Sequence, residues 1–120
     1  MSKSFREIKR GDVYFADLGN PFGAELGHRR YVLVLQAEET IEESSTVVVA
    51  VIVNGSVGRT DKVVVKFHIE ERNQEMNILL DHIRTIDKNR LGDPVGHLEG
   101  KEMDDVNAAL FFILGLDSEE

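Results

Sequence analysis

Residues 46–53 read Thr-Val-Val-Val-Ala-Val-Ile-Val, and this run decides how the rest of the chain is interpreted. Seven of its eight residues are apolar and most are β-branched, which favours a strand buried on both faces. Residues 29–36 form a second run of this kind, continuously apolar in its middle. Because strands that follow each other along a chain often pair, we predict that these two lie side by side in the core.

Shorter elements are predicted on both sides of this pair. The β-type runs are residues 11–18, 61–69, 77–80 and 82–86. Residues 37–45 contain four glutamates and are expected to form an exposed connection, and Asn54-Gly55-Ser56 has the chemistry of a turn. A helical turn is expected at residues 88–91, broken by Gly92-Asp93-Pro94.

The C-terminal segment has a different periodicity. Met103, Val106, Leu110 and Ile113 recur at spacings of three, four and three, which predicts an amphipathic helix, with Gly115 as its C-cap. Five or six short strands followed by one helix, with short connections, favour a small, strongly curved antiparallel β-barrel closed by that helix. At 120 residues the chain has the length of one domain, assigned here to residues 1–120.

Composition excludes several classes of protein. The chain has no cysteine, which rules out a disulfide scaffold, a cysteine-based zinc site and a cysteine nucleophile. No apolar stretch is long enough to span a membrane, and the N-terminus lacks the apolar region of a secretory signal, so we expect a cytoplasmic protein. The formal net charge of −8 argues, taken alone, against binding to nucleic acid.

Two polar residues at strand starts suggest an anion site. Arg30 begins one apolar run and follows residues 19–27, which contain three glycines and a proline and must form a loop. Thr46 begins the other run. If both lay at one end of the barrel, the guanidinium and the hydroxyl could bind a phosphate and stabilise charge that develops on phosphorus. No carboxylate pair or histidine cluster has the spacing of metal ligands, so we expect no metal and no cofactor.

Each of these residues also has a purely structural interpretation. Arg30 could be a solvated strand end, and Thr46 could be present for its β propensity. His28 could shuttle protons or be an ordinary loop histidine, and Glu25 could simply be solvated. Phe22 could stack on a base or pin the loop to the barrel. Residue chemistry alone therefore predicts a small β-barrel with an anion site and no more specific function.

Five blocks of the chain resemble the MazF/PemK-type toxins of type II toxin–antitoxin systems, in the same order. They are residues 8–18, the Gly-x-Glu loop at 23–25, the strand at 30–36, the strand at 45–50 and the block Leu-Leu-Asp-His-Ile-Arg-Thr-Ile-Asp-Lys-Asn-Arg-Leu at 79–91. The final helix and Leu114-Gly115-Leu116 are also similar. The resemblance covers about residues 8–116.

The resemblance implies an SH3-like barrel with a C-terminal helix, assembled as a homodimer, and a cognate antitoxin as partner. It implies sequence-specific cleavage of single-stranded RNA without metal, through attack of the ribose 2′-OH, leaving a 2′,3′-cyclic phosphate and a 5′-OH. Carried over by position, Arg30 and Thr46 would be catalytic. Glu25 and the residues around it would contact RNA, and these are Phe22, Gly23, His28 and Arg29.

The chain departs from the family pattern at three points. Tyr31 stands where the family has proline after the arginine, and Arg29 precedes Arg30, so a register shift by one would make Arg29 the functional residue. Residues 54–59 match no base-contacting loop, so the cleavage sequence is not readable. Two other functions stay open: a non-catalytic inhibitor like CcdB, which binds a protein such as DNA gyrase through the C-terminal end, and an inactive relative that only binds.

The distribution of charge removes the objection to RNA. Residues 1–37 carry a net charge of +2, residues 38–45 of −4, residues 46–98 of 0 and residues 99–120 of −6. The negative charge is therefore confined to one connection and the C-terminal segment. Charges about 8 Å or more apart are largely screened at physiological salt, so the segments with the candidate site can bind an anion.

Overall fold

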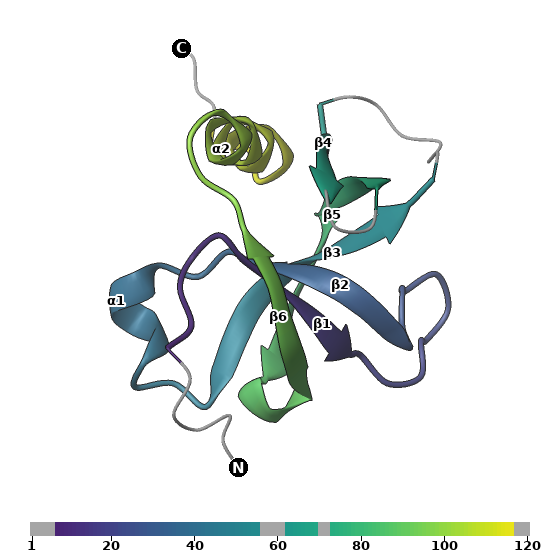
Figure 1. The fold of residues 1–120 in the computed structure, drawn as a ribbon, viewed down its shortest axis with the longest axis vertical. Helices are drawn as coiled ribbons and strands as arrows, with labels where there is room; N and C mark the ends of the chain where they lie inside the picture. Colours follow the sequence, from purple (N-terminus) through teal and green to yellow (C-terminus); the bar gives the residue numbers. More distant parts are fainter. Residues whose placement is uncertain (1–6, 56–61, 70–72, 117–120) are drawn as a thin grey trace.

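The structure, a computed structural model, describes residues 7–55, 62–69 and 73–116 (Figure 1). Ser56 of the predicted turn, most of segment 54–59 and the first residue of the predicted strand 61–69 lie outside these residues. The elements in chain order are β1 (Asp12–Asp17), β2 (Arg29–Val34), α1 (Glu38–Ile41), β3 (Thr46–Asn54), β4 (Val64–Ile69), β5 (Gln74–Asp87), the 3₁₀ turn η3 (Lys88–Arg90), β6 (Leu91–His97) and α2 (Lys101–Ile113).

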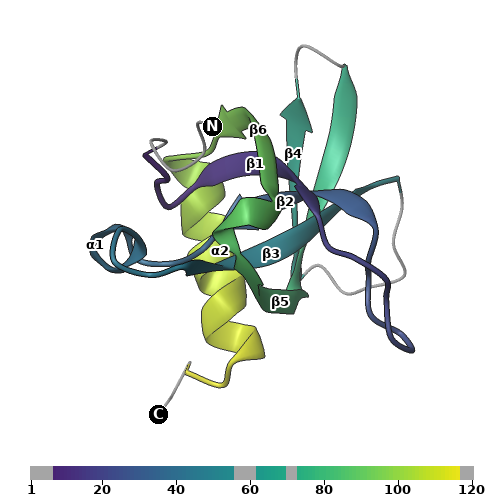
Figure 2. The ribbon, with the colours of Figure 1, turned by 90° about the horizontal axis from the view of Figure 1, so that it is seen from below.

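The six strands form one antiparallel sheet in the order β4-β5-β3-β2-β1-β6. The apolar run at 46–53 is the interior strand β3, and it pairs with β2 as predicted. A register shift between Ala50 and Val51 interrupts the β3–β5 pairing, and bulges of this kind bend and twist a sheet. The sheet therefore curls into a half-barrel, which confirms the prediction of a small, mainly β fold with a C-terminal helix (Figures 1 and 2).

Alternate residues of β3 enter two separate hydrophobic cores, one on each face of the sheet. Ala50 and Ile52 belong to the helix-side core, which also contains Val106 and Ala109 of α2. Residues 47, 49 and 51 of β3, all valine, belong to the loop-side core, against which Leu26 packs. Because both faces of β3 are covered, its sequence is continuously apolar rather than alternating.

Helix α2 lies over β4 and β5 and ends as predicted at Gly115 (Figure 1). Gly115 has φ +71°, its N–H bonds to the carbonyl of Phe112, and Leu116 N–H bonds to that of Phe111. This is a Schellman ending, which glycine adopts without strain. The predicted apolar face is only partly used, because Val106 is buried whereas Ile113 remains 37% exposed.

The structure differs from the predicted elements at three places. Residues 77–80 and 82–86 are one strand, β5, because the bulge opposite β3 lets it bend without ending. Residues 92–94 continue in β6, because proline is tolerated on an edge strand, where no partner needs its missing N–H. Residues 37–45 are not merely an exposed connection, since they contain α1, whose Ile41 is buried in the loop-side core.

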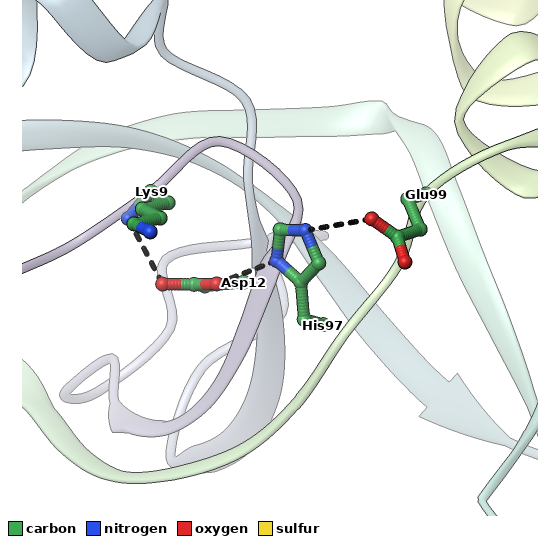
Figure 3. A network of polar contacts seen from close by, with 4 residues as sticks. All are labelled: Lys9, Asp12, His97 and Glu99. Atoms are coloured by element: carbon green, nitrogen blue, oxygen red, sulfur yellow. Dashed lines mark hydrogen bonds and ion pairs between the residues drawn. The ribbon is translucent and has the colours of Figure 1, made fainter.

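A polar network joins the start of β1 to the segment that leads into α2 (Figure 3). Asp12 accepts a bond from Lys9 N–H at 2.9 Å, and its other oxygen lies 2.7 Å from His97 Nδ1. His97 Nε2 lies 3.8 Å from Glu99. Leu98 N–H also bonds to the carbonyl of Gly11 at 2.8 Å, so the entry to α2 is attached to β1 by side chain and backbone together.

Candidate functional site

The glycine-containing segment between β1 and β2 is a hairpin-like loop with a narrow base and an exposed tip. At the base, Leu18 N–H donates to His28 O at 2.7 Å, and His28 N–H donates back to Gly19 O. A Cβ on Gly27 would lie 2.7 Å from atoms of Gly19 and Pro21, so only glycine lets the two sides approach this closely. The loop projects from the end of the sheet away from α1 (Figures 1 and 2).

The loop tip presents an aromatic ring to solvent. Phe22 is 82% exposed, which argues against the interpretation that it pins the loop to the barrel. Glu25 is also exposed, and its carboxylate accepts a bond from Phe22 N–H at 3.0 Å while Glu25 N–H donates to Phe22 O at 3.1 Å. Glu25 therefore shapes the turn that holds the ring, with Gly23 in the left-handed region at φ +60° inside it.

Arg30 lies at the base of this loop, on the face of the loop-side core. It pairs with Ala16, a member of that core, and directly opposite residues share a face. The side chain is half-buried, and its Nε donates to Gly27 O at 3.1 Å. A guanidinium has five N–H donors. This bond uses only one of them, and among the described residues it is the one hydrogen bond recorded for this side chain.

Arg84 is a second arginine at the same place, and sequence analysis did not single it out. It pairs with Val49, so it also lies on the loop-side face, and its Nη1 lies 3.4 Å from Leu26 O. The sequence did contain a signal, because Arg84 is a charged residue inside a run that otherwise fits a strand. A charged side chain that becomes half-buried in such a strand requires a hydrogen-bonding partner. Two guanidinium groups from β2 and β5 thus reach neighbouring carbonyls of one loop.

Thr46 is not part of this arrangement, and the expectation that it lies at the same end of the barrel as Arg30 is wrong. Strands β2 and β3 are antiparallel, so the starts of the two strands lie at opposite ends of the pair. Tyr31 pairs with Ile52, and therefore Arg30 lies across from Val53. Thr46 is seven residues earlier, roughly 23 Å away at about 3.3 Å per residue. Its hydroxyl contacts Ser44 Oγ at 3.2 Å.

The neighbouring predicted residues Arg29 and Tyr31 lie on the other face of β2. Arg29 is exposed and lies across from Asp17. Tyr31 packs its ring edge-to-face against Phe15 of β1 with a centroid distance of 5.3 Å. Because β2 includes both Arg29 and Tyr31, the absence of the family proline does not displace the strand. His28 is exposed and has φ +63°, a turn conformation. The geometry therefore favours Arg30 over Arg29.

A groove of about 730 Å³ lies between the loop and the bent part of β5. The loop contributes residues 22–26, β3 contributes Val51, and β5 contributes residues 81–85. One wall therefore carries an exposed aromatic ring and Glu25, and the other carries Asp81, His82 and Arg84. Such a combination of a cation, hydrogen-bonding groups and an aromatic platform suits a single-stranded nucleic acid, whose bases stack and whose phosphates attract arginine.

No cluster of three or more His, Asp or Glu side chains that could hold a metal ion occurs within the described residues. None of the helices in that part of the chain is long and apolar enough to cross a membrane.

The chain is similar to proteins of known family and structure. Residues 9–114 match the family described as PemK-like, MazF-like toxin of type II toxin-antitoxin system. The Endoribonuclease MazF of Staphylococcus saprophyticus is 39% identical over 115 residues, which is 91% of this chain and 92% of that protein.

Solved structures share the fold. MazF from Deinococcus radiodurans superposes with a TM-score of 0.74 at 20% identity, covering 92% of this chain and 98% of that one. A mycobacterial structure described as an endoribonuclease in complex with its cognate antitoxin gives a TM-score of 0.73 at 25% identity, covering 93% and 99%. The resemblance noted from the sequence is confirmed, and the chain belongs to the PemK-like, MazF-like family of type II toxin–antitoxin toxins.

Proposed function

We propose that this protein is a MazF-like endoribonuclease toxin that cleaves single-stranded RNA at specific sequences, without a metal ion, in the cytoplasm. The observation that carries the proposal is the half-buried Arg30 at the base of the loop between β1 and β2, in a chain 39% identical to an endoribonuclease MazF. The attacking group is supplied by the substrate, because the ribose 2′-OH lies next to the phosphodiester. The protein must then bind the RNA strand and stabilise the negative charge that develops on the phosphate group in the transition state.

The proposed reaction is an internal transesterification. The 2′-oxygen forms a bond to phosphorus and loses its proton, the bond from phosphorus to the 5′-oxygen breaks, and that oxygen gains a proton. The products are a 2′,3′-cyclic phosphate and a 5′-OH. Guanidinium hardly ever deprotonates, so Arg30 acts electrostatically, donating its terminal N–H groups to the phosphorane oxygens. This interaction is stronger in the transition state than in the ground state, which is what accelerates a reaction.

The loop residues have binding roles in this proposal. Phe22 stacks on a base of the splayed strand, since its ring is already solvent-exposed. Glu25 and Gly23 hold the turn that presents the ring. His28 and Arg29 are exposed at the loop base and contact flanking nucleotides in this proposal, Arg29 from the face of β2 opposite to Arg30. Thr46 has no role in this proposal at the site formed by the Arg30 of its own chain.

The decisive experiment is incubation of the purified protein with single-stranded RNA in EDTA, followed by mapping of the new ends. We expect discrete cuts bearing 5′-OH and 2′,3′-cyclic phosphate termini. Intact RNA with folded wild-type protein would overturn the proposal. Toxicity that survives Arg30→Ala but is lost on mutation of the C-terminal helix would instead indicate a CcdB-like inhibitor of a protein target. An inactive relative would neither cut RNA nor arrest growth.

We also propose that the toxin is a homodimer. Its C-terminal apolar patch, defined here as Phe111, Phe112, Ile113, Leu114 and Leu116, is 37–61% exposed in the single chain. Large apolar side chains left exposed together at one end of a helix are a feature of protein interfaces. Light scattering should give twice 13.5 kDa for the wild type, and Leu114→Asp should reduce it to the monomer mass. A wild-type monomer mass at micromolar concentration would contradict this proposal.

A cognate antitoxin is the second proposed partner, as in the mycobacterial complex. In this proposal a disordered segment of the antitoxin folds on binding and occupies the groove between the loop and β5, where its carboxylates meet Arg84. Competition between the antitoxin and an uncleavable RNA for the wild-type protein tests this. Simultaneous binding of both would contradict it.

A further inference from the structure

A third arginine, Arg90, contacts the side of the β1–β2 loop that leaves β1. Arg90 ends the turn η3, and the strand that follows it, β6, pairs with β1. This pairing brings Arg90 beside Asp17, the last residue of β1, and Arg90 Nη1 donates to Asp17 O at 3.0 Å. Arg30 and Arg84 contact the side of the loop that returns to β2. Guanidinium groups therefore hold the loop from both sides.

The Arg90 guanidinium also packs against Gly19, two residues further along the loop. A Cβ on Gly19 would lie 3.3 Å from Arg90 Nη1, so an added side chain would displace the guanidinium. Asp17 Oδ1 accepts a bond from Gly19 N–H at 3.0 Å. The carbonyl that Arg90 binds and the residue that it packs against thus belong to one local turn, and Arg90 fixes the position of that turn.

Gly19 connects this contact to the other side of the loop. Gly19 O accepts a bond from His28 N–H, and a Cβ on Gly27 would lie 2.7 Å from the same oxygen. Gly27 O in turn accepts the bond from Arg30 Nε at 3.1 Å. A continuous path of close contacts therefore runs from Arg90 through the base of the loop to Arg30.

The bond at Nε sets the direction of the whole Arg30 guanidinium. This group is planar and carries its N–H donors in a rigid fork, so a fixed Nε also fixes where the terminal N–H groups point. Donors that stabilise developing charge must be preorganised, and a misplacement of about 1 Å can cost about 10²-fold in rate. The position of Gly27 O therefore bears on the rate of any reaction that Arg30 promotes.

We propose that Arg90 is a positioning residue for RNA cleavage, which acts on Arg30 through the base of the loop and does not touch the substrate. The inference rests on the proposed function. Arg90 does not line the groove between the loop and β5, and its recorded contacts among the described residues are with the loop backbone.

An independent contact between Arg90 and RNA is the alternative, because the side chain is exposed and cationic. The two roles differ in how Arg90 and Arg30 combine. A residue that acts through Arg30 loses its effect when Arg30 is absent, whereas a separate phosphate contact keeps its effect in either background. A double-mutant cycle therefore separates positioning from direct binding.

The test is this cycle, measured as single-turnover cleavage of one labelled RNA at saturating protein concentration. The wild type, Arg90→Gln, Arg30→Ala and the double variant are compared at a temperature where circular dichroism shows each to be folded. Lys88→Gln is the matched control. Lys88 lies in the same turn η3, and its Nζ also donates to a backbone carbonyl, but to that of Ile41 in α1, away from the loop.

We expect Arg90→Gln to lower the cleavage rate about tenfold when Arg30 is present, the value of one charge-assisted hydrogen bond, and less than about twofold in Arg30→Ala. Lys88→Gln should stay within about twofold of the wild type. Arg90→Lys keeps a cationic donor and should lose less activity than Arg90→Gln.

Binding supplies a second readout that a general loosening of the loop would change. The probe is the same RNA with a 2′-deoxy sugar at the attacking position, which prevents cleavage. Its Kd should rise no more in Arg90→Gln than in Lys88→Gln, because each variant removes one positive charge. A larger rise in Kd would overturn the inference, since a loosened loop also displaces Phe22 at its tip.

Three further results would overturn the inference while leaving the endoribonuclease proposal standing. They are a wild-type cleavage rate in Arg90→Gln, an equal loss of rate in both backgrounds of the cycle, and a loss in Lys88→Gln as large as in Arg90→Gln. Failure of the proposed function looks different, because then the wild type does not cut RNA, or Arg30→Ala cuts it as fast as the wild type.

Discussion

Arg30 on β2 and Arg84 on β5 donate to the carbonyl oxygens of two consecutive loop residues, Gly27 and Leu26. The two arginines are 54 positions apart in the sequence, and only the pairing of both strands with β3 brings them to one loop. The bonds fix the base of the loop and concentrate two positive charges beneath it. Of the two arginines, Arg84 lines the groove between the loop and β5, whereas Arg30 lies at the base of the loop.

Replacement of Arg30 should abolish most activity, whereas replacement of its neighbour should not. We expect Arg30→Ala to lower kcat/KM for RNA cleavage by about 10²–10³-fold or more, as for loss of one transition-state donor. Arg29→Ala should cost severalfold, because this exposed side chain lies across from Asp17 on the other face. Single-turnover cleavage of one labelled RNA by both variants measures this. Equal losses would show that the two residues share the role.

Loss of Arg84 should loosen the loop. With the Nη1–Leu26 bond gone, amides of residues 19–27 should exchange with solvent severalfold faster in hydrogen–deuterium exchange, while β3 amides keep their rates. Global stability should fall by less than about 1 kcal/mol, since the 3.4 Å bond is weak. Arg84→Gln keeps a donor without the charge and separates loop closure from electrostatics. Unchanged loop exchange in Arg84→Ala would contradict this role.

Thr46→Ala should leave RNA cleavage within a few-fold of wild type. The Thr46 hydroxyl bonds to Ser44 Oγ at the end of β3 remote from Arg30, so it contacts no phosphate bound by the Arg30 of its own chain. Thr46→Ser keeps the hydroxyl and serves as the control. If Thr46→Ala lost as much RNA cleavage as Arg30→Ala, and Thr46→Ser restored it, Thr46 and Arg30 would have to come together from two different protomers.

Gly11 should be the least replaceable glycine of the β1–β6 junction. It has φ +96°, and a Cβ there would lie 2.6 Å from Leu98 O. Gly11→Ala should lower the free energy of unfolding by at least about 2 kcal/mol, from backbone strain and the displaced contact. Gly96→Ala is the matched control: with no atom within 4 Å of its Cβ, it should stay within about 0.5 kcal/mol of wild type. Urea denaturation of both variants gives the comparison.

Asn77→Val should stabilise the protein. Asn77 Oδ1 is buried and has no hydrogen-bond partner among the described residues, which costs about 1–3 kcal/mol of desolvation. Valine removes that cost, and the exposed Gly55 carbonyl released from Nδ2 can bond to water. We expect the free energy of unfolding to rise by about 1 kcal/mol. A fall of that size would instead show that the bond to Gly55 is worth more than the buried oxygen costs.

The sequence determined most of the elements and which strand is central. The apolar, β-branched run at 46–53 could only be a strand covered on both faces, and the spacing of Val106 and Leu110 could only be a helix with one buried side. Both follow from local side-chain chemistry and from the repeat of strand or helix. The family was also readable from blocks in a fixed order, and the family match over residues 9–114 confirms it.

Tertiary structure alone decided which polar side chains share a site. Arg30 and Thr46 both begin apolar strands, and nothing in either segment reveals that an antiparallel register puts them at opposite ends. Arg84 reaches a loop carbonyl 58 positions away by the same cause. Strand identity is a property of neighbouring residues, whereas register is fixed by pairing across the sheet, and that pairing assigns every polar group its neighbours.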